Sequence, residues 1–171
     1  YFGETAHLPY GEKSPEIIRR YSSRITQHLV ESGCKAIVVA CNSASSNAIE
    51  AIVMAAGPNM PVIDMVTPVI RSISAEDGCQ SVGLIGTRAT IASGLYGETM
   101  NQLNSNITLV SRATPLLASA IEEGFFNDSI PGAVLEAYFA DDSFKNIDSM
   151  ILGCTHYPLV RENVQALLPK G

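Results

Sequence analysis

Two segments of this chain share one pattern: an apolar run of strand length, then a cysteine, then polar residues that open a helix. The first segment reads AIVVACNSAS and contains Cys41, and the second reads SMILGCTHYP and contains Cys154. An unbroken apolar run of this length is typical of a buried parallel strand. Parallel α/β folds bind their ligands where such strands end. The pattern therefore predicts an α/β fold in which two thiols face each other across one pocket.

Strand-like and helical stretches alternate along the rest of the chain. We expect strands at residues 36–40, 61–65, 81–86, 107–110 and 150–152. We expect helices at 44–56, 116–123 and 133–140, and further helices that begin at Ser14, Thr67, Thr87 and Tyr157. This alternation predicts mostly parallel sheets with right-handed crossovers, flanked by helices. A boundary near residues 67–78 divides the chain into 1–67, part of a first lobe, and 68–171, a second lobe.

Composition argues against several classes of protein. Of the 171 residues, 17 are acidic and 11 are basic, whereas proteins that bind nucleic-acid backbones show a basic surface. No apolar run approaches the ~20 residues that a membrane-spanning helix needs. Four cysteines without close-set spacing are typical of reduced thiols rather than of a secreted disulfide framework. We therefore expect a cytoplasmic protein that binds neither nucleic acid nor membrane.

The residues around Cys41 and Cys154 favour a chemical role for both thiols. A single cysteine is most often a small buried hydrophobe. Cys41, however, precedes Asn42, Ser43 and a helix start, whose partial positive charge favours thiolate. His156 follows Cys154 closely enough to exchange protons with it. Two such thiols suit a reaction that needs a base on one side of a carbon and an acid on the other.

The other cysteine arrangements point to no second site. Cys34 lies in the turn after a helix and Cys79 follows a polar turn, so we interpret both as structural. A zinc site formed by Cys41, Cys154 and His156 is the weaker alternative, because structural zinc usually takes closely paired ligands and only one C-x-H occurs here. We expect no metal.

Two further segments follow turn or strand-end patterns. Pro9, Tyr10 and Gly11 form either an ordinary turn or a loop whose backbone contacts a substrate. Thr87 and Thr90 either cap a helix or direct hydroxyl and N–H groups at a carboxylate. Composition alone leaves both interpretations open at each segment.

No motif in the chain indicates a nucleotide or another cofactor. The segment Gly83–Gly86 does not match the dinucleotide fingerprint, and no phosphate-binding G-x-x-x-x-G-K-[ST] occurs. No lysine lies at a comparable strand end, where it could hold pyridoxal phosphate. Glu122 and Glu123, judged by position alone, form a solvated helix end.

Several segments resemble those of the glutamate racemases in sequence and in their order along the chain. These segments are YFGETAHLPYGEKS, KAIVVACNSAS, PVIDMVTPV, VGLIGTRATIASGLY, PLLASAIEEG and MILGCTHYPLV, which together cover nearly the whole chain. The resemblance implies two similar α/β lobes with the active site in the cleft between them. It also implies a cofactor-independent racemase that converts L-glutamate to D-glutamate for peptidoglycan, and it leaves room for a homodimer.

The resemblance also implies roles for particular residues. Cys41 matches the thiol that acts on D-glutamate, and Cys154 matches the thiol that acts on L-glutamate. Glu122 and His156 match residues that assist proton transfer near Cys154. Substrate-contacting positions match Pro9, Tyr10, Gly11, Asn42, Ser43, Thr87, Thr90 and Thr155.

The chain departs from the family pattern at a few positions and in length. Ser43 replaces the commoner threonine, and Glu4 and His7 replace an aspartate and an arginine. The family's first strand, with its D-S-G-x-G-G loop, and its final segment have no counterpart here. We therefore expect an internal fragment with an incomplete first lobe, lacking one residue that assists the first cysteine.

Racemisation needs a thiolate on one face of the Cα atom and a thiol on the other. A free thiol titrates near ~8.5, far below an amino acid's Cα–H, so the site must stabilise carbanionic charge with preorganised donors. Without an electron sink, the mechanism is direct deprotonation by positioned acid–base groups. Two alternatives stay open: an aspartate racemase of the same fold, and a catalytically silent binding or regulatory module.

Overall fold

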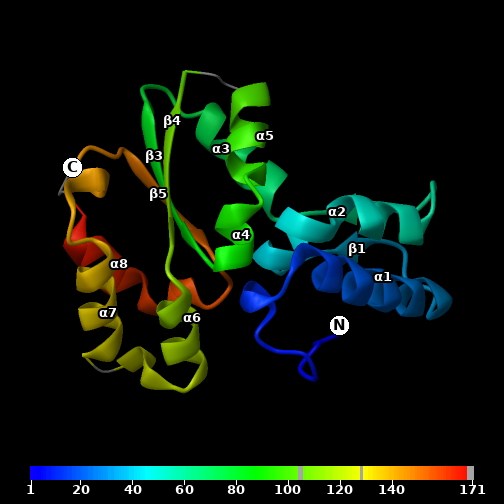
Figure 1. The fold of residues 1–171 in the computed structure, drawn as a ribbon. Helices are drawn as coiled ribbons and strands as arrows, with labels where there is room; N and C mark the ends of the chain where they lie inside the picture. The colour runs from blue at the N-terminus through cyan, green and yellow to red at the C-terminus, as the bar shows by residue number, and fades with distance from the viewer. Residues whose placement is uncertain (104–105, 128, 169–171) are drawn as a thin grey trace.

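Helices and short parallel strands alternate along the chain (Figure 1). The structure, a computed structural model, describes residues 1–103, 106–127 and 129–168. The strands are β1 (Ile37–Val38), β2 (Val62–Ile63), β3 (Ser81–Gly86), β4 (Thr108–Ala113) and β5 (Ser149–Gly153). The α-helices are α1 (Pro15–Glu31), α2 (Asn42–Ala56), α3 (Val66–Ser74), α4 (Arg88–Ala92), α5 (Leu95–Leu103), α6 (Pro115–Glu122), α7 (Ile130–Tyr138) and α8 (Arg161–Leu167). The 3-10 helices are η1 (Tyr10–Glu12), η2 (Phe125–Asn127), η3 (Asp142–Phe144) and η4 (Tyr157–Val160).

The first sheet contains β1 and β2, which pair in parallel. Both strands lie where the apolar runs predict them, but they are shorter, because within the described residues each strand has only the other as its partner. Ile37 is 5% exposed and packs in a core that α1 and α2 also line, whereas the next residue, Val38, is 59% exposed. Helices therefore cover only one face of this sheet.

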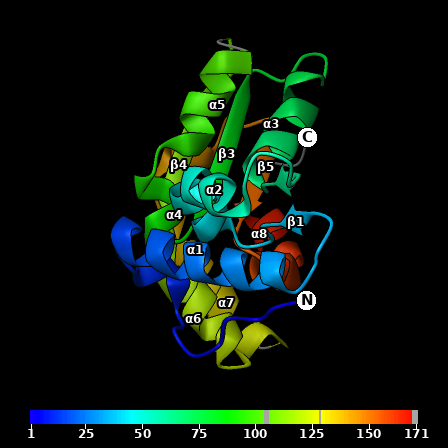
Figure 2. The same cartoon turned by 90° about the vertical axis from the view of Figure 1, so that its right-hand side faces the viewer.

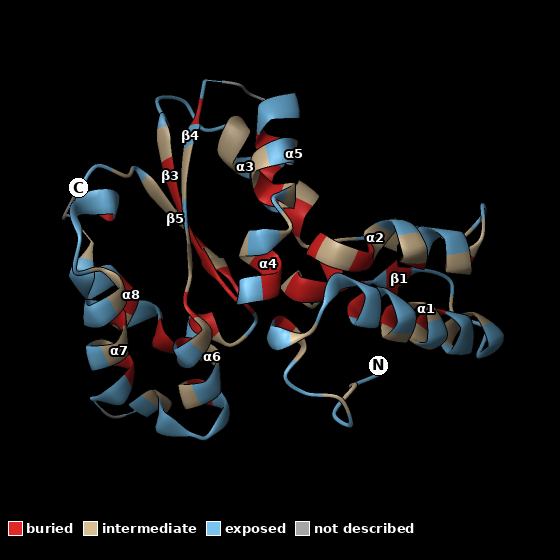
Figure 3. Ribbon diagram, in the orientation of Figure 1, coloured by how far each residue is buried: buried red, intermediate tan, exposed pale blue. Residues whose placement is uncertain are grey.

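The second sheet has the order β4-β3-β5, with all strands parallel. Successive residues of β3 point to opposite faces, as the strand period requires. Val82 and Leu84 pack with α3 and α5, whereas Ile85 packs with α6, α7 and α8. Figure 3 shows the buried residues running along β3, the central strand. The predicted α/β class is confirmed as two small parallel sheets flanked by helices.

The two sheets are linked through α4, which lies between the second sheet and α2 (Figure 1). Figure 2 shows α1 and α2 in front of the second sheet. All strands within each sheet are parallel, so the segments that follow β3 and β5 begin at the same edge of the second sheet, where the strands have their carboxyl ends. The segment that follows β1 begins at the corresponding edge of the first sheet.

Among the described residues, no helix is long and apolar enough to cross a membrane. The division of the chain at residue 67 stays a prediction.

Two of the predicted helix starts are confirmed and one is wrong. The hydroxyl of Ser14 caps α1, and the hydroxyl of Thr87 caps α4. Thr67 was expected to begin α3, but the carboxylate of Asp64 accepts hydrogen bonds from the N–H groups of Val66 and Thr67, at 2.6 and 2.7 Å. The aspartate therefore fixes the start of α3 one residue earlier than the threonine predicts.

The single helix expected after Thr87 is divided into α4 and α5. Gly94, between the two helices, has a φ of 72°, which side chains with a Cβ rarely adopt. The chain therefore turns at this glycine and α5 takes a new direction.

Candidate active site

Cys41 lies between β1 and α2 as the N-cap residue of the helix. Burial raises the pKa of the Cys41 thiol, while N–H groups of Ala44 and Ser43 and the Ser43 hydroxyl lower it by donating to the sulfur. The net shift is upward, so the group is a thiol at neutral pH. The first turn of α2 is nevertheless arranged to stabilise a thiolate whenever one forms.

Cys154 directly follows β5, and its side chain is buried. Burial raises the pKa of Cys154 to about 11, opposed by the N–H of His156 and increased further by the charges of Cys41 and Glu122. Ser43, two residues after Cys41, lies 2.9 Å from Thr87, which follows the end of β3, and Gly86 at that end pairs with Gly153, the residue before Cys154. The structure thus brings together the two cysteines that end separate strands in the sequence.

A histidine and a carboxylate extend from Cys154. The Cys154 sulfur lies 3.5 Å from Nδ1 of His156. Nε2 of the same ring contacts the carboxylate of Glu122, the last residue of α6. When Nε2 donates its hydrogen to the carboxylate, Nδ1 is left to accept a proton from the thiol. The three groups therefore form a path for moving the proton of Cys154.

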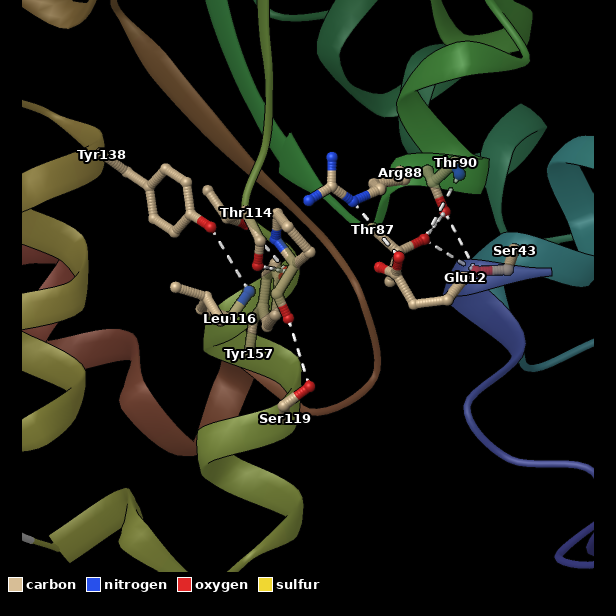
Figure 4. Close-up of polar contacts among 11 residues, drawn as sticks. Glu12, Ser43, Thr87, Arg88, Thr90, Thr114, Leu116, Ser119, Tyr138 and Tyr157 are labelled. Carbon is tan, nitrogen blue, oxygen red and sulfur yellow. Dashed lines mark hydrogen bonds and ion pairs between the residues drawn. The ribbon is translucent and has the colours of Figure 1, made fainter.

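Three buried hydroxyls join α2 to α4 beside Cys41 (Figure 4). The Ser43 and Thr87 oxygens are 2.9 Å apart, and those of Thr87 and Thr90 are 3.0 Å apart. Ser43 and Thr90 complete the ring at 3.3 Å. Each hydroxyl has one proton, so while Ser43 donates to the Cys41 sulfur, Thr87 can donate to Ser43 and Thr90 to Thr87. A hydroxyl of this cluster can donate a hydrogen bond to an anion only after it rotates away from the neighbouring hydroxyl.

The loop at Pro9, Tyr10 and Gly11 packs directly on this cluster. A Cβ atom at Gly11 would lie 2.4 Å from Cβ of Thr87, so only glycine fits. Glu12 and Arg88 form an ion pair at 3.2 Å that also ties η1 to α4. These contacts hold the loop against the start of α4.

The Tyr10 hydroxyl is buried and has no hydrogen-bond partner within the described ranges. Burial raises the pKa of Tyr10 to about 12, with further contributions from Glu4 and Cys41. The group therefore stays protonated and is a donor near Cys41 that nothing in the described chain uses.

The remaining predicted residues lie at the edges of this region. Asn42 begins α2, and its Oδ1 accepts a hydrogen bond of 2.6 Å from the Tyr96 hydroxyl. Thr155 is exposed next to Cys154, and Pro9 is exposed next to Tyr10.

Two grooves flank α4. One, of about 410 Å³, is lined by Gly11, Asn47 and Arg88 among others. The other, of about 430 Å³, is lined by Thr90 and Tyr96 among others. Neither groove reaches Cys41 or Cys154. Within the part of the chain that the structure describes, no three His, Cys, Asp or Glu side chains could hold a metal ion.

Comparison with known proteins decides the family. The sequence profile described as Asp/Glu/hydantoin racemase matches residues 1–170. This chain belongs to that racemase family. A glutamate racemase from Thermus thermophilus is 41% identical over 170 residues, and one from Geobacter metallireducens is 38% identical over 161. A solved glutamate racemase from Francisella tularensis, in complex with D-glutamate, superimposes with a TM-score of 0.91 at 36% identity.

The racemase-family chain spans about three fifths of the length of these relatives. The alignments cover 99% of this chain and 61% of the Thermus protein, and 94% of this chain and 59% of the Geobacter protein. The Francisella comparison covers 99% of this chain and 65% of the solved chain.

Three buried residues with polar side-chain groups in this racemase-family chain were not predicted from the sequence: Tyr96, Thr114 and Tyr157. Tyr96 bonds to Asn42, and Tyr157 bonds to Thr114. Both tyrosines lie at or near the ends of segments already quoted for the resemblance, IASGLY and GCTHYP. Their position there was the available signal, but local pattern does not distinguish a buried hydroxyl with a partner from an ordinary core aromatic.

Proposed function

We propose that this chain supplies the two acid–base thiols of a glutamate racemase that interconverts L- and D-glutamate without a cofactor. The observation that carries the proposal is that the segments of Cys41 and Cys154 both adjoin the end of β3, with Cys154 in contact with His156. The D-glutamate in the similar Francisella structure supports the choice of substrate. All four cysteines are free, which fits an enzyme of the reducing cytoplasm.

Proton transfer runs between the two faces of the Cα atom. From L-glutamate, His156 accepts the proton of Cys154, and the resulting thiolate removes the Cα proton. The Cys41 thiol then gives its proton to the opposite face, which forms D-glutamate and leaves Cys41 as thiolate. From D-glutamate the same steps run in reverse, beginning at the Cys41 thiolate. One C–H bond breaks and one forms in either direction.

Polar groups around the thiols stabilise the charge that develops on the substrate. The raised pKa of Cys154 makes it a stronger base once deprotonated, yet the Cα proton is far less acidic, so donors must lower the barrier. The proposed donors are Asn42, Ser43, Thr87, Thr90 and Thr155, and the loop of Pro9, Tyr10 and Gly11 is proposed to contact the substrate. The N-terminus of α2 adds positive potential for a carboxylate.

The test is racemisation of glutamate by the complete gene product and by its C41S and C154S variants, followed by polarimetry. Both variants should lose racemisation, because serine is too weak an acid to replace either thiol. Racemisation at the wild-type rate in C154S would overturn the assignment of two bases. A substrate panel separates the alternatives: preference for aspartate would replace glutamate in the proposal, and no activity on either would favour a binding module.

A further inference from the structure

Tyr96 connects the second sheet to the residue next to Cys41. It belongs to α5 and is 2% exposed. Its hydroxyl donates to Oδ1 of Asn42, the first residue of α2, at 2.6 Å. Burial, with the nearby charge of Asp64, raises the pKa of Tyr96 to about 12, so the hydroxyl remains a donor. This bond holds the first turn of α2, whose N–H groups face the Cys41 sulfur.

Tyr157 connects the loop of Cys154 to the ends of the two other strands in its sheet (Figure 4). It is fully buried, and its N–H donates to the carbonyl of Cys154 at 3.1 Å. Its hydroxyl lies 2.8 Å from the Thr114 hydroxyl and donates to the Thr114 carbonyl at 3.0 Å. The N–H of Thr114 donates in turn to the carbonyl of Gly86, the last residue of β3, at 2.8 Å. One tyrosine thus ties the segments that follow β3, β4 and β5.

Each tyrosine joins a thiol-bearing segment to another element: Tyr96 reaches Asn42 from α5, and Tyr157, three residues after Cys154, reaches Thr114. Each is buried, and each hydroxyl bonds to a group beside a thiol-bearing loop rather than to the thiol. A buried hydroxyl left without its partner is costly, so each bond restrains the loop that it joins. Breaking one bond disturbs one side of the site and leaves the other bond in place.

We propose that Tyr96 and Tyr157 are positioning residues, one for each thiol: Tyr96 fixes Cys41 through Asn42, and Tyr157 fixes Cys154 through Thr114. The effect of the two tyrosines on thiol reactivity can be measured without a substrate and does not depend on the proposed function. Their effect on racemisation rests on the proposed function. Two measurements separate these consequences.

The first measurement is site-resolved alkylation of this chain by iodoacetamide across a range of pH, read by mass spectrometry. In Y96F we expect alkylation of Cys41 to slow about fivefold, because the first turn of α2 loosens and its N–H groups stabilise thiolate less, with Cys154 unchanged. In Y157F we expect alkylation of Cys154 to quicken about fivefold and its pH midpoint to fall, because water reaches a thiol whose pKa burial had raised, with Cys41 unchanged.

The matched control is Y138F. Tyr138 lies near Tyr157, but its hydroxyl accepts a hydrogen bond of 3.3 Å from the N–H of Leu116, which belongs to neither thiol-bearing segment. This variant should leave both alkylation profiles as in the wild type. If Y157F does not fold, as judged by circular dichroism, T114V removes the contact between the two hydroxyls and leaves the Thr114 carbonyl as the acceptor for Tyr157, so it should change Cys154 in the same direction but less. Equal changes at both thiols, or no change at either, in Y96F and Y157F would overturn the proposal.

The second measurement compares hydrogen exchange with racemisation in D₂O, using the complete gene product. With D-glutamate, Y157F should raise the ratio of exchange to inversion, because Cys41 still removes the proton while Cys154 returns one slowly. With L-glutamate, Y96F should raise the same ratio. If the wild-type protein acts on neither enantiomer, the proposed function fails, while the alkylation profiles still decide the role of the tyrosines.

Discussion

In the proposed mechanism, proton transfer at Cys154 depends on side chains from two separate segments. Glu122 reaches His156 from the end of α6, and His156 contacts the sulfur from the loop after β5. The carboxylate orients the imidazole through Nε2 and leaves Nδ1 facing the sulfur as the acceptor for the thiol proton. The raised pKa of Cys154 makes such an acceptor necessary at neutral pH.

Replacing Glu122 by glutamine tests this path. E122Q keeps the shape of the side chain but removes its charge, so we expect kcat for glutamate to fall about tenfold to hundredfold. The matched control is E123Q, which changes the neighbouring exposed glutamate, for which the structure gives no contact with His156. An equal loss in both variants would contradict a specific role for Glu122.

The raised pKa of Cys154 predicts its pH profile. Below its pKa of about 11 the group is protonated, so the thiolate fraction grows with pH. Alkylation of Cys154 by iodoacetamide should rise about tenfold per pH unit from neutral pH up to that range, whereas an unperturbed thiol levels off near ~8.5. Mass spectrometry of the alkylated peptide measures the rate. A midpoint at or below that of a free thiol would show that burial does not control this group.

At the scale of elements, the loop before α1 packs on the start of α4 through a close contact between Gly11 and Thr87. Gly11 lies against Thr87, so the loop and the hydroxyl cluster are one packed unit. Local pattern predicted a turn at Gly11 and a cap at Thr87, and the cap is confirmed. It could not predict their contact, because that depends on how α4 lies against η1.

The substitution G11A tests this packing. The added methyl group would overlap Thr87, so we expect the free energy of unfolding to fall by about 1–3 kcal/mol. In G97A the new Cβ, inside α5, meets Leu109 at an ordinary 3.7 Å. That control should raise stability by about 0.5–1 kcal/mol, since alanine favours a helix more than glycine does. Urea unfolding measures both, and a stable G11A would contradict the close fit.

At the scale of the whole molecule, the sequence predicted the class of fold and the order of its strands along the chain. Apolar runs correctly marked β1, β3 and β5; burial on both faces explains the run of β3, whereas Val38 of β1 is exposed. The paired cysteines predicted that their two segments meet, and both segments adjoin the end of β3, whereas the catalytic role of the thiols stays a prediction.

The contacts between distant segments could not be predicted in this way. Tyr96 and Asn42 are 54 positions apart, and Tyr157 and Thr114 are 43 apart. Nothing in the local pattern of either segment specifies the partner, because the pairing arises only when helices pack on their sheets. The start of α3 was missed for a related reason: Asp64 competes with Thr67 for the same N–H groups.

The measurement that tests two-sided proton transfer most directly is proton NMR of L- and D-glutamate in D₂O with the complete gene product. Loss of the Cα–H signal from both enantiomers, with deuterium in the inverted product, is the predicted result, because Cys154 and Cys41 each remove a proton from one face. Inversion that retains the original hydrogen, or exchange from one enantiomer alone in the wild-type protein, would contradict the two-thiol mechanism.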